Sequence, residues 1–164
     1  MLTSISKLRK LQLEHPVILT GGAFDILHYG HARFLNFCKS LGKTLVVKVS
    51  SDERVREMKG PDRPVNSEKS RAMLLDNLKS VDYVLISNHR CESSTVIRSL
   101  RPDILVLSTE NKADKLKFLR NELGKTELGR LRVKFVPHFK KDCLSSTKLI
   151  NKIRSRTSER LQAY

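Results

Sequence analysis

Five short apolar runs recur along the chain, and stretches with helical patterning separate them. The runs are rich in Val, Ile and Leu, and most are continuous rather than alternating, as is typical of strands buried on both faces of a sheet. This alternation predicts βαβ units, so we expect an α/β fold, a Rossmann-like doubly wound sheet of about five parallel strands with helices on both faces. The expected strands are Pro16–Thr20, Thr44–Ser50, Asp82–Ser87, Asp103–Ser108 and Arg132–Pro137.

Apolar residues at helical spacing lie between and after these runs. Gly42 is expected to end one helix and Ser67 to cap another. The expected core-facing residues are Phe34, Phe37, Cys38 and Leu41 in the first helix, and Met73, Leu74 and Leu78 in the second. Further helices are expected over Ser93–Leu100, over Lys112–Leu123, and from Ser145 onward with Leu149, Ile150 and Ile153 on one face.

The composition is that of a globular protein, since 39% of the 164 residues are hydrophobic and 30% are charged. We expect a single domain over residues 1–164, with an N-terminal extension (1–14) that carries a short amphipathic helix and a basic tail (155–164). No apolar run approaches the ~20 residues of a membrane span, and no signal peptide is evident. The three cysteines are scattered without zinc-site spacing, which favours a reducing, cytoplasmic location.

The net charge of +15 predicts attraction to polyanions or anionic substrates. Nucleic acids, nucleotides and phosphorylated metabolites all satisfy that requirement. Sequence-specific nucleic-acid recognition is not favoured, because the chain has no tryptophan, few aromatic residues and no zinc-finger or RNP-type motif.

The segment GGAFDILHYGH follows the first expected strand directly. Gly21 and Gly22 allow a tight turn and a close backbone approach to a ligand, and backbone N–H groups there favour an anion. His28 and His31 are spaced i, i+3, so they share a face if a helix begins near residue 27, and Gly30 leaves room between them. Two imidazoles placed in this way can donate hydrogen bonds to a phosphate. The alternatives are ordinary surface or core histidines, or half of a metal site, which lacks an adjacent carboxylate or an HExxH pattern.

Three segments together resemble one known family. GGAFDILHYGH resembles the GTFDxxHxGH signature of the cytidylyltransferase-like small nucleotidyltransferases. VSSDERVREMKGPDRPVNSEKSRAMLLDNLKSVDYV is similar to the family's second block, and CLSSTKLINKI to its closing ISTT-type block. The three have the family's order and spacing from Val17 to Ile153. Within the family, the chain looks most like the adenylyltransferase that acts on heptose 1-phosphate, followed by glycerol-3-phosphate cytidylyltransferase, and archaeal FAD synthetase is also similar.

The resemblance implies a reaction. Such enzymes transfer a nucleoside monophosphate from ATP or CTP to a small phosphorylated metabolite, here a sugar phosphate or polyol phosphate, and release pyrophosphate. The acceptor phosphate is largely a dianion at neutral pH, so no general base is needed. Mg²⁺ is expected on the triphosphate without dedicated protein ligands. Relatives are commonly homodimers, so a homodimer is expected. The alternative function is a nucleotide- or polyanion-binding module that has lost catalysis.

The resemblance also implies site residues. His28 and His31 correspond to the family's HxGH histidines, Lys59 to its loop lysine and Arg71 to its helix arginine, and these four form the implied catalytic set. The loop that faces the phosphates corresponds to Gly22, Ala23 and Phe24, with Gly30 between the histidines. Asp25 is expected to hold this loop together and Arg63 to assist. The closing block, where hydroxyl groups and a helix N-terminus hold the β- and γ-phosphates, corresponds to Ser145, Ser146 and Thr147.

Some of these residues also have an ordinary structural interpretation. Separately, three departures from the family pattern affect the expected substrate. Lys59 read alone is a solvated lysine, and Ser-Ser-Thr read alone is an N-cap. Ala23 stands where many members have Thr. Lys48 interrupts a buried strand, so it must reach solvent or an anion. The segment Val106–Asp114 replaces the usual Gly-Gly-Asp type segment after the fourth strand. Acceptor and base choice are therefore expected to differ from those of both close relatives.

Overall fold

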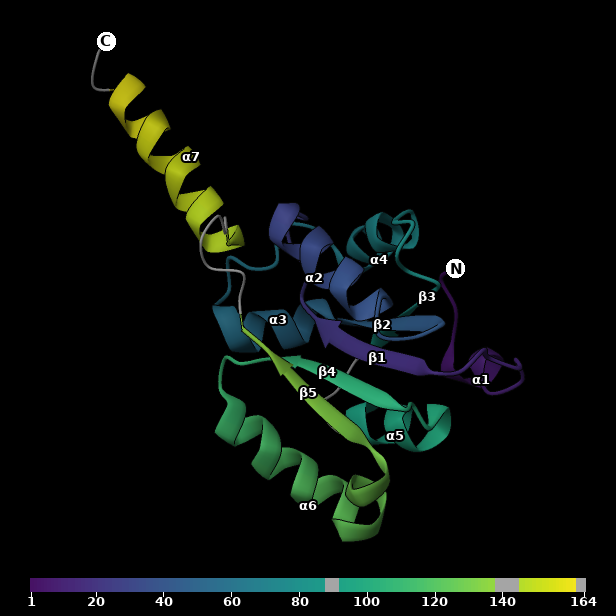
Figure 1. The fold of residues 1–164 in the computed structure, drawn as a ribbon. Coiled ribbons are helices and arrows are strands. Elements are labelled where there is room, and N and C mark those ends of the chain that lie inside the picture. Colours follow the sequence, from purple (N-terminus) through teal and green to yellow (C-terminus); the bar gives the residue numbers. More distant parts are fainter. Residues whose placement is uncertain (88–91, 138–144, 162–164) are drawn as a thin grey trace.

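The five strands form one parallel sheet in the order β3-β2-β1-β4-β5 (Figure 1). The computed structural model describes residues 1–87, 92–137 and 145–161, apart from the side chains of 92, 93, 125 and 157–161. The prediction of a parallel, Rossmann-like α/β sheet is confirmed. The strands are β1 (Val17–Gly22), β2 (Thr44–Ser50), β3 (Tyr83–Ser87), β4 (Ile104–Ser108) and β5 (Arg132–Val136).

Helices cover both faces of this sheet. In Figure 1, α2 and α4 lie over one face, and α5 and α6 lie over the other. The last helix, α7, rises beside the edge where the strands end and extends away from the sheet. The helices are α1 (Ile5–Leu8), α2 (Tyr29–Lys39), α3 (Asp52–Lys59), α4 (Glu68–Asp76), α5 (Glu92–Leu100), α6 (Lys112–Arg130) and α7 (Ser146–Leu161).

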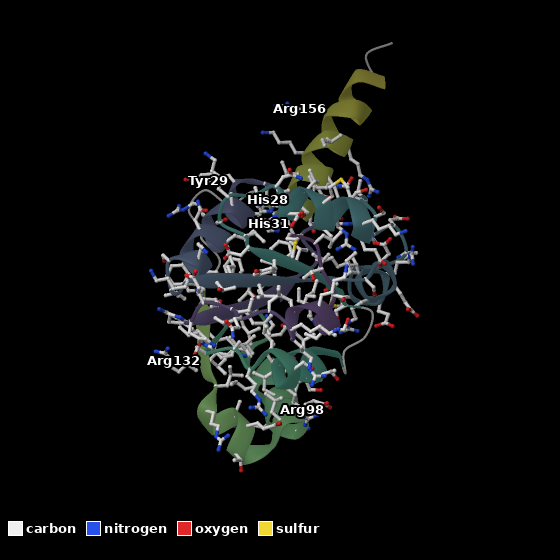
Figure 2. All side chains as sticks on the ribbon, turned by 90° about the vertical axis from the view of Figure 1, so that its right-hand side faces the viewer. His28, Tyr29, His31, Arg98, Arg132 and Arg156 are labelled. Carbon is white, nitrogen blue, oxygen red and sulfur yellow. The ribbon has the colours of Figure 1, made fainter. Side chains whose placement is uncertain are left out.

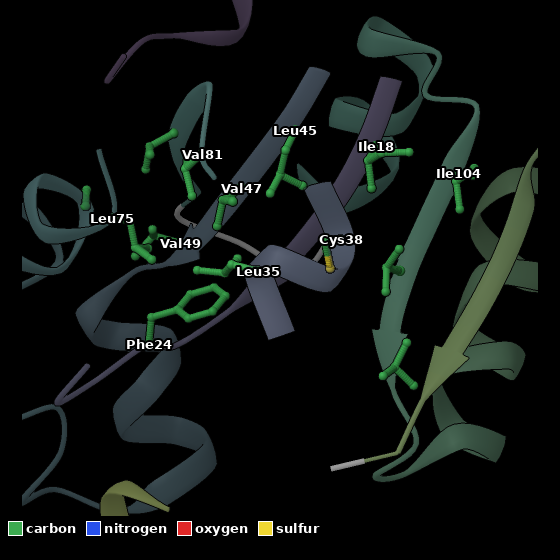
Figure 3. Close-up of a cluster of buried hydrophobic side chains, with 14 residues drawn as sticks. Ile18, Phe24, Leu35, Cys38, Leu45, Val47, Val49, Leu75, Val81 and Ile104 are labelled. Carbon is green, nitrogen blue, oxygen red and sulfur yellow. The ribbon is translucent and has the colours of Figure 1, made fainter. Parts of the chain in front are cut away.

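Two apolar clusters, one on each face, hold the helices to the sheet. The cluster under α2 and α4 includes Phe24, Leu35 and Val47, which are nearly or fully buried (Figure 3). The opposite cluster joins Leu8 of the N-terminal extension to Leu119 of α6. Each central strand contributes alternate side chains to the two clusters, which explains why the runs are apolar throughout rather than alternating.

The helix α3 lies outside the predicted helices. It buries a single apolar residue, Val55, so it carries no apolar periodicity. Its signals are local instead: Ser51 Oγ accepts a hydrogen bond from the Arg54 N–H at 3.2 Å, and Asp52 lies in the first turn, where a negative charge is favourable. Gly60, with φ of 94°, ends the helix.

The prediction that Met73 and Leu74 face the core is wrong. They are 64% and 47% exposed, whereas Arg71, Ala72 and Leu75 of the same helix are fully buried. A prediction from apolar residues alone places arginine at the surface. Because Arg71 is buried, that prediction assigns the wrong face of α4 to the core. The burial of Arg71 decides which face of α4 meets the sheet.

Two other helices run further than expected. The α6 helix continues to Arg130, although Gly124, with φ of 69°, departs from helical geometry close to the expected end at Leu123. The α7 helix continues to Leu161, through much of the expected basic tail. The N-terminal extension also contacts the sheet, since Leu2 forms a parallel bridge with Val84 of the outer strand β3.

The sheet opens between β1 and β4 at its carboxyl edge. Backbone pairing between β1 and β4 ends at Thr20 and Val106, although each strand runs two residues further. Over those two residues β1 still pairs with β2, and β4 still pairs with β5. The chain connections reverse direction at this same position, since β1 is flanked by β2 and β4. Ligands of open α/β sheets bind at such a topological switch point.

We predict that Gly42→Ala destabilises the fold by about 1–3 kcal/mol, as overpacking does. A Cβ at Gly42 would lie 2.4 Å from the Pro16 carbonyl oxygen and 2.8 Å from Ile18 Cδ1, so β1 would have to shift. Gly129→Ala is the matched control, because a Cβ there meets nothing within 4 Å and alanine favours a helix. Urea unfolding of both variants measures the difference, and equal stability would contradict the packing described.

Candidate active site

The two histidines lie together at the carboxyl edge of the sheet. His28 is the N-cap residue of α2, and the helix begins at Tyr29, two residues later than the sequence suggested. The two imidazole rings are stacked nonetheless, with centroids 3.8 Å apart and planes at 21° (Figure 2). The ring of Phe24 meets the His31 ring edge-on at 5.3 Å. Gly30 lies between the histidines in the first turn of α2.

The loop between β1 and α2 (residues 23–28) has a backbone conformation that its own residues disfavour. Phe24 and Ile26 both have φ of 50°, in the left-handed region that bulky and β-branched residues rarely adopt. Gly22 precedes them, and a Cβ there would lie 3.2 Å from the Phe24 ring. Such a conformation persists only where surrounding contacts enforce it.

Asp25 supplies several of these contacts. Its side chain is fully buried and accepts hydrogen bonds from Arg63 Nε at 2.8 Å and from the backbone N–H groups of Val65 and Asn66 at 3.1 Å. Burial alone would raise the pKa of Asp25, but the two backbone donors and the Arg63 guanidinium outweigh it, so the pKa is lowered. Asp25 thereby ties the β1–α2 loop to the segment between α3 and α4.

Arg71 lies beneath the same loop rather than open to a ligand. Its side chain has no exposed surface. The guanidinium donates to the carbonyl oxygens of Ala23, of Ser50 at 2.8 Å and of Asn66 at 2.9 Å, and to Asp52 Oδ1 at 2.7 Å. Because four of its five donors are used in this way, its contacts are those of a residue that positions the loop.

Lys59 and Arg63 come from the end of α3 and from the segment between α3 and α4. Lys59 is the last residue of α3, and its side chain is exposed. The pKa of its ammonium is lowered, first by partial desolvation and then by the charge of Arg63, while Asp25 and Glu110 act in the opposite direction. Arg63 itself is buried against Asp25. A lysine placed among these charges gains from an arriving anion.

The start of α7 lies against the histidine loop. The Ser146 hydroxyl is buried and donates to the Asp25 carbonyl oxygen. Ser145 Oγ caps the helix by accepting from the Lys148 N–H at 3.2 Å, and Thr147 is exposed. Free N–H groups in the first turn of a helix attract anions, so the loop and α7 offer donors from two sides.

Lys48 lies in β2, and its side chain is on the face of the sheet opposite the histidines. It pairs with Gly21 in the β1–β2 register, and a Cβ at Gly21 would lie 3.3 Å from Lys48 Cε. The glycine therefore leaves room for the aliphatic part of the lysine, and the residue remains half-buried. The strand tolerates this lysine because its apolar stem packs along the backbone.

Lys115 was not among the predicted site residues, yet it lies at the switch point. Its ammonium donates to the carbonyl oxygen of Ser108 at 3.0 Å and to Ser108 Oγ at 2.7 Å, over the end of β4. Desolvation lowers its pKa, and Glu110 partly offsets this effect. Asn111, in the left-handed region, precedes α6 and turns the chain so that Lys115 reaches back. Asn111 lies within Val106–Asp114, the segment that differs from the family's usual Gly-Gly-Asp type sequence.

Among the described residues, no three His, Cys, Asp or Glu side chains are grouped to hold a metal ion. The buried carboxylate of the loop, Asp25, is already engaged by Arg63 and two backbone donors. None of the described helices combines the length and the apolar character that crossing a bilayer requires.

The family model described as Cytidylyltransferase-like matches residues 19–152, which include every element of the site. The chain belongs to the cytidylyltransferase-like family. It is 40% identical to the FAD synthase of Thermococcus sibiricus over 136 residues, which are 83% of this chain and 90% of that protein. It is 43% identical to the bifunctional protein HldE of Helicobacter pylori over 103 residues, which are 63% of this chain and 22% of that protein. This member of the cytidylyltransferase-like family is a nucleotidyltransferase, and the prediction of an enzyme is confirmed.

Solved structures agree on the fold. The lipopolysaccharide core biosynthesis protein of Thermoplasma volcanium has 32% identity and a TM-score of 0.62, with 77% of this chain and 98% of that chain covered. Pantothenate synthetase of Thermus thermophilus has a TM-score of 0.57 at 15% identity, covering 83% of this chain and 61% of the other, and this likeness concerns the fold alone.

We predict that Asp25→Asn lowers stability at pH 7 by about 3–5 kcal/mol, because it leaves Arg63 buried without its counter-charge. The lowered pKa of Asp25 means that its ionised form stabilises the fold above the unfolded value of about 3.9, and that this contribution is lost as the pH falls through the folded value. Urea unfolding between pH 7 and pH 2 measures both effects.

The exposed Asp62, in the same segment as Arg63, provides the control variant Asp62→Asn. This control should keep the wild-type loss of stability in acid, whereas Asp25→Asn should lack the part that Asp25 contributes. Parallel acid profiles for the wild type and Asp25→Asn would contradict the role given to this carboxylate.

Proposed function

We propose that this nucleotidyltransferase transfers a nucleoside monophosphate from ATP or CTP to a small phosphorylated acceptor and releases pyrophosphate. The observation that carries the proposal is the stacked pair His28 and His31 at the end of β1, with the first turn of α7 against the same loop. The histidines follow β1, whose backbone pairing with β4 has already ended at Thr20 and Val106. This arrangement suits a bound triphosphate.

In this proposal an acceptor phosphate oxygen attacks the α-phosphorus, and the bond from the α-phosphorus to the bridging oxygen breaks. The electron pair leaves with pyrophosphate, and no proton must be removed from the dianionic acceptor. His28 and His31 donate hydrogen bonds to the α-phosphate as its charge redistributes. Ser145 and Thr147, with the α7 N-terminus, are assigned to the β- and γ-phosphates.

The other residues position these groups or neutralise charge. Asp25, Arg63, Arg71 and Ser146 are assigned to positioning, because their contacts join the β1–α2 loop to its neighbours. Lys59 is assigned to the phosphates, since a partly desolvated ammonium gains most from an anion. Mg²⁺ would arrive on the triphosphate and neutralise part of its charge, with Asp25 already engaged elsewhere.

Among acceptors, we favour FMN with ATP as the first pair to test. The FAD synthase relative is matched over 90% of its own length, whereas HldE is matched over 22%. A sugar phosphate or polyol phosphate remains the second candidate, on the strength of the HldE match and the three sequence blocks. We also propose a cytoplasmic homodimer, which size-exclusion chromatography with light scattering tests.

The experiment that tests the proposal is pyrophosphate release from each of the four NTPs with Mg²⁺ against FMN, heptose 1-phosphate, glycerol 3-phosphate, phosphoethanolamine, phosphocholine and phosphopantetheine. We expect release with one NTP and one acceptor, since positioned phosphates should react selectively. Silence across the panel together with an absence of NTP binding in thermal shift would contradict the proposal. That result would favour the polyanion-binding module instead.

We predict that His28→Ala and His31→Ala each lower kcat by about 100-fold or more, as the loss of a donor to transition-state charge does. His15→Ala is the matched control, because His15 pairs with Asp103 at the opposite edge of the sheet, before β1 begins. Steady-state pyrophosphate release should leave the control within about twofold of the wild type. Equal rates in all three variants would remove the histidines from the mechanism.

A further inference from the structure

Lys115 places a half-buried positive charge at the end of β4. Among the described residues its ammonium donates to two groups, the carbonyl oxygen and the hydroxyl of Ser108, and both are neutral. Within the described part of the chain, no carboxylate forms an ion pair with it at 4.0 Å or less. An ammonium has three donors, so one N–H remains after these two bonds.

The surroundings of this ammonium leave its charge incompletely balanced. Desolvation lowers the pKa of Lys115, which means that its charged form is disfavoured where it stands. Glu110 raises the pKa values of both Lys115 and Lys59, so the two lysines approach one carboxylate from α6 and from α3. The two cations therefore share the influence of Glu110, and Asp25 acts on Lys59 as well. Such a place gains from an additional anion.

The position is the switch point itself. Ser108 is the last residue of β4, and the β1–β4 ladder has already ended at Thr20 and Val106. The β1 side of this opening continues into the glycine loop and the stacked histidines. Lys115 therefore lies on the β4 side of the same opening, where an anion would face the histidine loop across the separated strands.

A structural role alone accounts poorly for a lysine here. The backbone after β4 is already secured, because the Thr109 N–H donates to the Val136 carbonyl oxygen at 3.0 Å. A hydrogen bond to Ser108 could be made by a neutral side chain without the cost of desolvating a charge. The charge is what distinguishes lysine in this place, and a charge is what an anionic ligand requires.

We propose that Lys115, oriented by Ser108, binds the phosphoryl group of the acceptor substrate and sets the preference for a phosphate monoester. This inference rests on the proposed function, because it assigns the second substrate of that reaction to the β4 side of the opening. The ammonium holds the attacking phosphate opposite the α-phosphate that the histidines contact. As a point charge with one remaining donor, it orients the dianion without enclosing it.

The first test is steady-state kinetics of Lys115→Met with the NTP and acceptor that the wild type uses. The KM for the acceptor should rise about tenfold or more, while the KM for the NTP stays within about twofold. Lys117→Met is the matched control, since Lys117 is exposed on the same helix and should leave both constants unchanged. An unchanged acceptor KM in Lys115→Met, or an equal rise in Lys117→Met, overturns the proposal.

The second test uses no turnover, so it separates this inference from the proposed function. The melting temperature of the wild type should rise with inorganic phosphate, as a probe of the acceptor group, and with pyrophosphate, as a probe of the leaving group. Lys115→Met should lose the response to phosphate and keep the response to pyrophosphate. If no acceptor reacts but this selective loss is found, the subsite stands and the proposed reaction fails. An equal phosphate response in both proteins overturns the subsite whether or not turnover is found.

A third measurement excludes a purely structural role. Without added anion, Lys115→Met should melt no lower than the wild type, because the variant removes a partly desolvated charge. Ser108→Ala, which removes one of the two groups that orient the ammonium, should raise the acceptor KM by a smaller factor. A lower melting temperature in Lys115→Met with an unchanged acceptor KM would mean that Lys115 only stabilises the end of β4. That result would overturn the proposal.

Discussion

The β1–α2 loop adopts a conformation that its sequence disfavours, and the rest of the site depends on the contacts that enforce it. Two non-glycine residues, Phe24 and Ile26, have positive φ there, and such residues cost about 1–3 kcal/mol each. Arg71 and Ser146 bind carbonyl groups of the loop, and the Asp25 carboxylate binds the segment that follows α3. The loop therefore presents its backbone and both histidines in one arrangement, which is what preorganised stabilisation of a phosphate requires.

The β1–α2 loop follows the place where β1 and β4 separate at the carboxyl edge of the sheet. A parallel sheet whose connections reverse direction at β1 cannot carry a crossover helix directly over that position, so the carboxyl ends stay accessible. The first strand leads to the histidines and the fourth leads to Ser108 and Lys115. In the proposed reaction, the two substrates are bound from these two strands, each by residues that its own strand positions.

The sheet and the proximity of the two histidines were predictable from sequence, and the burial of Arg71 was not. Continuous apolar runs are a direct consequence of burial on both faces of the sheet. The motif of two histidines after a glycine turn can be recognised in the sequence alone. Burial of Arg71 depends on carbonyl groups from three separate segments, so no local pattern reports it, and the same omission places Met73 and Leu74 on the wrong side of α4. The position of Lys115 at the end of β4 depends on the left-handed backbone conformation of Asn111, which a local sequence pattern does not report.

We propose that a nucleotide is transferred from a triphosphate to an acceptor phosphate at the opening between β1 and β4. Phosphorus-31 NMR of the protein with ATP, Mg²⁺ and the candidate acceptors follows every phosphorus atom at once. We expect the β- and γ-phosphates to appear as pyrophosphate and the α-phosphate to appear in a new phosphoanhydride with the acceptor. Orthophosphate as the product, AMP with pyrophosphate and no new phosphoanhydride, or an unchanged spectrum would contradict it.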